Sequence, residues 1–284
     1  MKMIIRKILA IYFVFLFVLL NCSLVYAHDP PPVASDVSIN SGAGSISLTE
    51  GTTTNVVVTA TVTDDNGCED ITGVTVKFYK TAMGAGAADD ENNHYTVTTP
   101  TDVVKNSCVS LVATYTATIP VWYYADPAEW TTQVTPTDGT DGTASTDTIT
   151  INTLIALSVT DTIDYGPLAL GADTGAGDAT TTVTNTGNAS IGVQVDGYGA
   201  SDSDGKSMIC TFGSILLANE KYSKTASTAY ASKTALTDTA TTVVDFSIAQ
   251  RTDGATTGDI YWGFGMPANG VGGSCTGTVV FTPL

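Results

Sequence analysis

Side chains with oxygen ligands cluster in one short turn of the sequence, the acidic Asp64, Asp65, Glu69 and Asp70 and the amide Asn66. A calcium ion takes about six to eight oxygen ligands, commonly from Asp, Asn and backbone carbonyl groups. These residues therefore form a candidate calcium site, and no other cofactor is expected. Turns also favour Asp, Asn and Gly for backbone reasons alone, and the spacing matches no EF-hand loop. Solvated turns remain the alternative to calcium.

Aromatic side chains provide a second candidate site, for carbohydrate. Trp122, Tyr124 and Trp130 are close in sequence, and strand alternation sends Trp122 and Tyr124 to the same side. Exposed rings in this arrangement could stack on the rings of a glycan. The alternative is that they fill the core, as a buried Trp commonly does in immunoglobulin-like domains.

Catalytic chemistry has little support in the sequence. The two histidines, His28 and His94, leave little room for a Ser-His-Asp or Cys-His arrangement, and no P-loop, GxSxG or HExxH motif occurs. Copper held by His28 and His94 is one enzymatic alternative, because imidazole suits copper. A loop like that of the aspartic proteases, at residues 173–176, is another. We expect a protein that is not an enzyme.

The first 27 residues are typical of a signal peptide. A positively charged start precedes an apolar run over residues 8–20, and Ala27 suits a signal-peptidase site. The run is short for a membrane span of about 20 residues, although an uncleaved anchor is the alternative. We expect a secreted or cell-surface protein that meets the membrane only through this segment.

The predicted export bears on the state of the cysteines, because disulfides form in oxidising compartments outside the cytoplasm. Cys22 lies in the signal segment, which leaves Cys68, Cys108, Cys210 and Cys275. An even number of cysteines in an exported chain indicates two disulfides, with three pairings open. If the chain divides into two domains, Cys68 with Cys108 and Cys210 with Cys275 is the natural pairing. No CxxC motif supports a zinc ribbon or a thioredoxin-like redox site.

The composition favours strands over helices. Charged residues make up 14% of the 284 residues, against about 25% in typical globular chains, and the sequence is rich in Thr, whose branched side chain suits strands. Lys and Arg number 11 against 28 Asp and Glu, for a formal net charge of −17. This acidic balance excludes the basic face that a nucleic-acid binder needs.

Short strands separated by turn residues run through the chain, with the longest alternation over residues 109–119. Roughly seven short strands with a turn about every 8 to 12 residues are typical of an immunoglobulin-like sandwich, and the pattern restarts after residue 153. We predict an all-β chain. A signal peptide (1–27) and a Pro-rich leader (28–34) precede two tandem immunoglobulin-like β-sandwich domains (35–153 and 154–284).

Three segments, PPVASDVSI, TVTDDNGCEDITGVTVKFY and VTNTGNASIGVQV, resemble parts of secreted prokaryotic surface proteins built from tandem immunoglobulin-like domains. The resemblance implies a β-sandwich fold at the cell surface and carries over no catalytic residue. We expect a structural or adhesion protein that presents its loops to an envelope component, a glycan or another surface protein. The alternative is a carbohydrate-binding module that uses Trp122, Tyr124 and Trp130.

Overall fold

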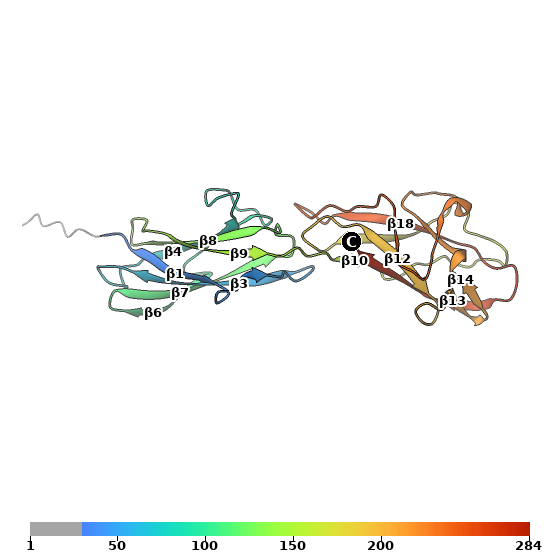
Figure 1. Ribbon diagram of the computed structural model, residues 1–284, viewed down its shortest axis with the longest axis horizontal. Helices are drawn as coiled ribbons and strands as arrows, with labels where there is room; N and C mark the ends of the chain where they lie inside the picture. The colour runs from blue at the N-terminus through green and yellow to red at the C-terminus, as the bar shows by residue number, and fades with distance from the viewer. Residues whose placement is uncertain (1–29) are drawn as a thin grey trace, which may run out of the picture.

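The computed structural model describes residues 30–284, and the chain is all-β in that range. The predicted signal peptide and His28 lie outside the described residues. The strands form two lobes that follow one another along the long axis (Figure 1). We call residues 30–152 the N-terminal lobe and residues 153–284 the C-terminal lobe.

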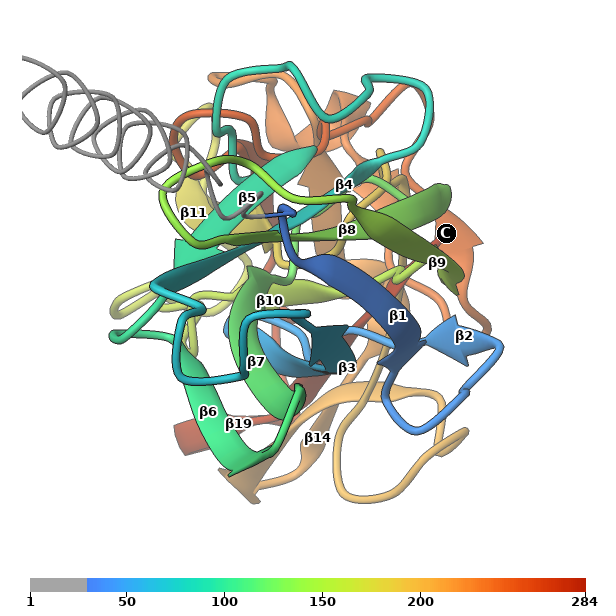
Figure 2. The same cartoon turned by 90° about the vertical axis from the view of Figure 1, so that its left-hand side faces the viewer.

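The N-terminal lobe is a sandwich of two sheets, seen end-on in Figure 2. Its strands are β1 (Val33–Ile39), β2 (Ser45–Ile46), β3 (Thr53–Thr63), β4 (Gly73–Lys80), β5 (His94–Thr98), β6 (Val103–Val109), β7 (Val112–Trp122), β8 (Glu129–Thr137) and β9 (Ser145–Ile151). One sheet has the order β1-β3-β7-β6 and the other β2-β9-β8-β4-β5. The strands β2 and β9 pair in parallel. This is the order of an immunoglobulin sandwich, in which the last strand, β9, lies beside β8.

Alternation along the strands builds the core of this lobe. In β3, Val56, Val58 and Val62 are buried while their neighbours face outward, as the two-residue period of a strand requires. Trp130 on β8 is fully buried and stacks on Phe78 of β4, with ring centroids 4.8 Å apart. This Trp fills the space between the two sheets.

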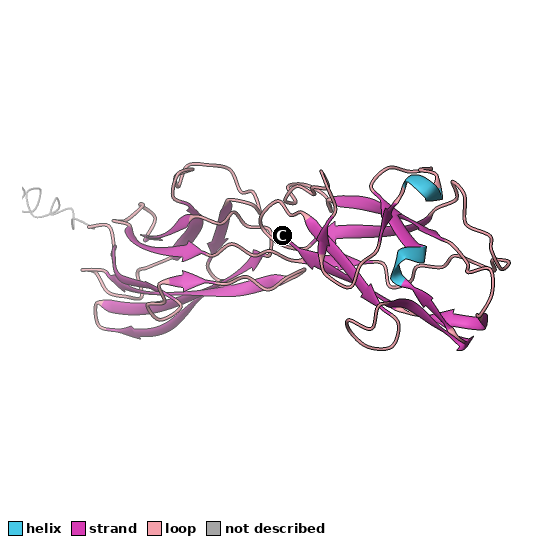
Figure 3. Ribbon diagram, turned by 45° about the vertical axis from the view of Figure 1, so that its right-hand side comes forward, coloured by secondary structure: helices cyan, strands magenta, loops and turns pink. Residues whose placement is uncertain are grey.

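The C-terminal lobe contains eleven shorter strands and two single-turn 3-10 helices (Figure 3). They are β10 (Leu157–Val159), β11 (Ala179–Asn185), β12 (Val193–Tyr198), β13 (Lys206–Phe212), β14 (Ser214–Leu216), η1 (Leu217–Asn219), β15 (Glu220–Ser223), η2 (Tyr230–Ser232), β16 (Thr234–Ala235), β17 (Thr241–Thr242), β18 (Thr257–Phe264), β19 (Gly272–Thr276) and β20 (Thr278–Pro283). One sheet has the order β10-β11-β18-β15-β16. The facing layer consists of β17-β12-β20 and β14-β13-β19, and β13 and β19 continue the pair formed by β12 and β20.

Each lobe has its own buried apolar cluster. One cluster draws only on residues of the N-terminal lobe, apart from Leu154 at its border, and two further clusters lie wholly in the C-terminal lobe. No sheet of the described residues contains strands from both lobes. The division at residue 153 stays a prediction and falls between β9 and β10. The last two residues of the predicted leader, Val33 and Ala34, belong to β1.

Candidate functional site

The outer edge of β20 is open. The strand pairs with β12 on one side, and within residues 30–284 no strand pairs with its other side. Leu284 and Gly192 exchange both backbone hydrogen bonds, at N–O distances of 3.0 and 3.2 Å, which sets the antiparallel alternation. The backbone N–H and C=O groups of Val280 and Thr282 therefore face β12, whereas those of Val279 and Phe281 face outward.

The two lobes differ at this edge. In the N-terminal lobe, β8 pairs with β4 on one side and with β9 on the other. In the C-terminal lobe, β12 and β20 take the places of β4 and β8, since β10-β11-β18-β15 has the same order as β1-β3-β7-β6. No described strand takes the place of β9. The last described strand of the C-terminal lobe therefore lies at an edge of its sheet.

A groove of about 570 Å³ lies beside this edge. Residues 159–165 form one wall, and Cys275 to Val279 together with Phe281 form the other. Val159, Ile163, Val279 and Phe281 are only partly buried against the adjoining apolar cluster. These apolar side chains would gain burial if another chain entered the groove.

Glu220 is an acidic residue in this groove and is only 2% exposed. The hydroxyl of Tyr165 donates a hydrogen bond to its Oε1 at 2.7 Å. Burial raises the pKa of Glu220 to about 7, and the hydrogen bond from Tyr165 opposes this rise. The carboxyl group is therefore poised to change charge near neutral pH.

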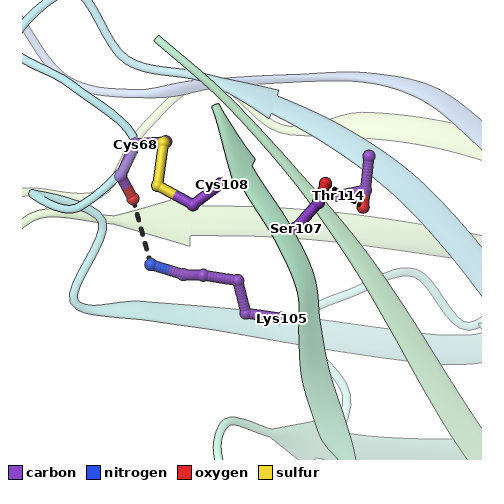
Figure 4. The surroundings of a disulfide bond; sticks show 5 residues. All are labelled: Cys68, Lys105, Ser107, Cys108 and Thr114. Carbon is purple, nitrogen blue, oxygen red and sulfur yellow. Dashed lines mark hydrogen bonds between the residues drawn. A yellow bond between two sulfur atoms is a disulfide. The ribbon is translucent and has the colours of Figure 1, made fainter. Parts of the chain in front are cut away.

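Both predicted disulfides are present. Cys68, in the loop between β3 and β4, bonds to Cys108 on the edge strand β6. The Nζ of Lys105 donates to the Cys68 carbonyl oxygen at 3.0 Å beside this bond (Figure 4). Cys210 on β13 bonds to Cys275 on β19, its direct partner across the two strands. Each disulfide lies within one lobe.

The acidic turn of the N-terminal lobe folds on its own hydrogen bonds. Asp64 is buried, and its Oδ1 accepts from the backbone N–H of Asn66 at 2.8 Å. Asp65, Glu69 and Asp70 are exposed. Among the described residues, no group of three or more His, Cys, Asp and Glu side chains is arranged to hold a metal ion. Calcium binding at this turn stays a prediction.

The aromatic candidate site lies at the junction of the lobes, and two of its rings are buried. Trp130 belongs to the core, and its indole N–H donates to the Asp126 carbonyl oxygen at 2.9 Å. Tyr124 is buried beneath Trp122 on one side and the guanidinium of Arg251, from the other lobe, on another. Of the two alternatives for these rings, Trp130 and Tyr124 therefore follow burial and not the exposed platform. At both positions, removing the apolar ring from water stabilises the folded chain.

Amide side chains join the lobes at the same junction. Asn188 is fully buried and donates to the carbonyl oxygens of Ala125 and Asn152, both at 3.0 Å, while its Oδ1 accepts from the Leu154 N–H at 2.7 Å. Gln250 donates to the Tyr124 carbonyl oxygen at 2.7 Å. These bonds satisfy backbone groups that the β-ladders leave free.

Those residues of the enzymatic alternatives that lie within residues 30–284 do not assemble a site, and His28 lies outside this range. His94 is buried, and its Nδ1 lies 2.8 Å from Asp89 Oδ1. Asp173 caps its own turn by accepting from the Gly175 N–H at 2.8 Å. Within residues 30–284, no helix is long and apolar enough to cross a bilayer.

The strand order and the buried cores define an all-β protein with an immunoglobulin-like sandwich. No family model matches the sequence, and no curated protein is significantly similar to it. Among solved structures, a chaperone–tip adhesion subunit pre-assembly complex of the archaic chaperone-usher Csu pili of Acinetobacter baumannii shares 10% identity, with a TM-score of 0.39. That match covers 87% of this chain and 99% of the other.

A structure titled BspA_C_WT shares 10% identity over 89% of this chain and 95% of its own, with a TM-score of 0.24. The secreted serine protease VesC of Vibrio cholerae shares 8% identity over 84% of this chain and 49% of its own, with a TM-score of 0.18. At these identities and TM-scores the likenesses assign no function to this chain.

Proposed function

We propose that this protein is an exported, non-enzymatic structural or adhesion protein of the cell surface, and that a β-strand from a second protein completes its C-terminal lobe. The open edge of β20 beside the apolar groove carries this proposal. An extended peptide can add to such an edge, where backbone hydrogen bonds supply affinity and alternate side chains fill pockets. An exposed edge with partly buried apolar side chains is otherwise a liability for aggregation.

The added strand comes from a second protein in this proposal, since every described strand already has a place in one of the sheets. The chain enters the described structure at Pro30, at the end of the N-terminal lobe farthest from the groove (Figure 1). The loops at that end, between β3 and β4 and between β8 and β9, stay available to contact an envelope component, a glycan or another surface protein.

Two disulfides fit an extracytoplasmic location, because such bonds persist in oxidising compartments. Calcium at the Asp64 turn belongs to the proposal only as a stabilising ion for that loop.

The test is to supply the strand within the same chain. The full protein is extended after Leu284 by an Asn-Gly turn, which favours a hairpin, and by a strand of alternating Val and Thr that runs back along β20. The midpoint of thermal unfolding should rise by roughly 5 °C or more, because a few kcal/mol of added burial shifts a domain of this size by that amount.

A matched extension carries Ser in place of each Val, so that it keeps the backbone but loses the apolar side chains. This control should leave the midpoint within about 1 °C of the unextended chain. Equal midpoints for the Val-Thr extension, the control and the unextended protein would rule out strand addition at this edge.

A further inference from the structure

Only one of the two carboxylate oxygens of Glu220 accepts a hydrogen bond from another described residue. Tyr165 donates to Oε1, and no side chain or backbone group of the described residues donates a hydrogen bond to Oε2. The neighbouring Lys221 points away across β15 and lies over the ring of Tyr230, with Nζ 4.3 Å from the ring centroid. Oε2 is not one of the fully buried polar atoms that lack a partner, so it stays accessible from the groove that Glu220 lines. A donor that enters the groove could bond to it, and a positively charged donor would bond most strongly.

All of the charged side chains that line the groove are acidic. Its lining residues include three acids, Asp161, Asp164 and Glu220, and no Lys, Arg or His. Asp161 and Asp164 are exposed at the mouth, whereas Glu220 is enclosed. A strand that enters this groove therefore meets a negative wall, and a negative strand would be repelled.

The apolar and acidic parts of the groove lie in different stretches. Val279 and Phe281 pack with Val159 and Ile163 against one apolar cluster. Glu220 pairs across the sheet with Phe264, which packs in a second cluster with Met208 and Cys275. A strand in the groove would therefore meet apolar side chains along β20 and the carboxyl group of Glu220 beside β19.

We infer that the partner strand carries a lysine or arginine at the inward position beside Cys275 and Gly277, where it pairs with Glu220, and apolar residues at the inward positions beside Val279 and Phe281. The inference rests on the proposed function and names the chemistry of the partner. A buried, charge-assisted hydrogen bond discriminates between partners more strongly than apolar contact does.

Ion pairing at this position depends on pH. Because burial raises the pKa of Glu220 to about 7, the carboxyl group is mostly neutral at pH 5 and mostly charged at pH 8. The groups that face it are Tyr165, which donates to it, and the acids Asp161 and Asp164 at the mouth of the groove. The preference for a cationic strand should therefore be strong at pH 8 and weak at pH 5.

The test uses three fluorescein-labelled peptides, each a strand of alternating Val and Thr that differs at one inward position, which carries Lys, Met or Glu. Binding to the full protein is measured by fluorescence anisotropy at pH 8 and pH 5. The Lys peptide should bind about 10-fold more tightly than the Met peptide at pH 8, since a charge-assisted hydrogen bond is worth about that factor. The Glu peptide should bind most weakly.

Two variants separate Glu220 from the general charge of the groove. Glu220→Gln should abolish the advantage of the Lys peptide, whereas Asp161→Asn should leave most of it. Equal binding of the Lys and Met peptides at pH 8, in the unmodified protein, would overturn the inference while the proposed function stands. If no peptide binds and the extension after Leu284 leaves the unfolding midpoint unchanged, the proposed function fails as well.

A second copy of this chain is the other occupant that the experiment can reveal. Concentration-dependent dimerisation of the unmodified protein that is blocked by the extension after Leu284 would assign the groove to self-association. That result would also overturn the inference of a cationic partner strand, because β20, the strand that would pair with its own copy at this edge, contains no Lys or Arg.

Discussion

At the scale of single residues, Glu220 shows how one buried acid can make the stability of a lobe depend on pH. The native state holds its proton up to a pKa of about 7, against an ordinary value of 4.5. The folded chain therefore binds more protons than the unfolded chain between these values. Stability falls as the pH rises from about 4.5 to 7, and the whole loss is present above pH 7.

Glu220→Gln should remove this loss, because the amide keeps the hydrogen bond from Tyr165 and never ionises. At pH 8 we expect the free energy of unfolding to rise by about 2 to 3 kcal/mol, and at pH 4.5 to change by less than about 1 kcal/mol. Urea unfolding at both pH values measures the difference. The exposed residue Glu50 supplies the control, Glu50→Gln. A gain of the same size at both pH values would refute this explanation.

Sequence reasoning predicted some residues of the site and missed others for clear reasons. The cysteines were predictable because an even number in an exported chain indicates disulfides. Glu220 follows a 3-10 turn in a stretch without clear alternation, so nothing local marks it as buried. For Tyr124 the alternation was visible, but its burial at the junction of two lobes is set by distant residues such as Arg251. Trp130 lies in the core of the N-terminal lobe, which was the alternative to exposure.

At the scale of elements, the order of the strands leaves an edge in each lobe. The edge strand β6 of the N-terminal lobe is held by a disulfide, whereas the edge of β20 in the C-terminal lobe is open. The strands themselves were predictable from alternation of apolar and polar residues, as over residues 112–121 in β7. Their neighbours were not, because pairing joins segments far apart in sequence. The open edge of β20 follows from the strand order alone, and a run of seven or more strands in the sequence gives no sign of it.

The disulfide between Cys68 and Cys108 holds the edge strand β6 to the loop between β3 and β4, across a separation of 40 residues. Replacing both cysteines by Ser should lower the free energy of unfolding by about 4 kcal/mol, since a loop of that length regains its freedom in the unfolded state. Denaturant unfolding measures the loss. Val109→Ala, at an exposed neighbour, should cost less than about 0.5 kcal/mol. A loss no larger than that of this control would show that the bond stabilises little.

At the scale of the whole molecule, buried amides make the junction between the lobes a specific contact. Asn188 bonds to Ala125, Asn152 and Leu154, and Asn92 bonds to the carbonyl oxygens of Tyr124 and Arg251 at 2.9 and 2.8 Å. The sequence has no Pro-rich or Gly-rich linker around residue 153, which is consistent with lobes in direct contact. It could not identify the amides, because each one satisfies backbone groups of the other lobe.

Asn188→Ala should loosen this junction. The variant leaves the Leu154 N–H and two carbonyl oxygens without their partner, at a cost of about 2 to 3 kcal/mol, and the lobes should then bend relative to each other. Small-angle X-ray scattering should show a broader distribution of interatomic distances than for the unmodified chain. Gln194→Ala, at an exposed amide bonded only within the C-terminal lobe, should leave the distribution unchanged. An unchanged profile for Asn188→Ala would mean that other contacts fix the angle.

The unpaired edge of β20 is the feature on which the proposed function depends. Residue-resolved amide hydrogen exchange tests most directly whether this edge is unpaired. In the unmodified protein, the amides of Val280 and Thr282 should be protected by β12, while those of Val279 and Phe281 exchange rapidly. The strand appended after Leu284 should slow exchange at Val279 and Phe281 and leave Val280 and Thr282 as they were. Slow exchange at Val279 and Phe281 in the unmodified monomer would mean that the outer edge of β20 is already paired, which would contradict the proposed strand addition.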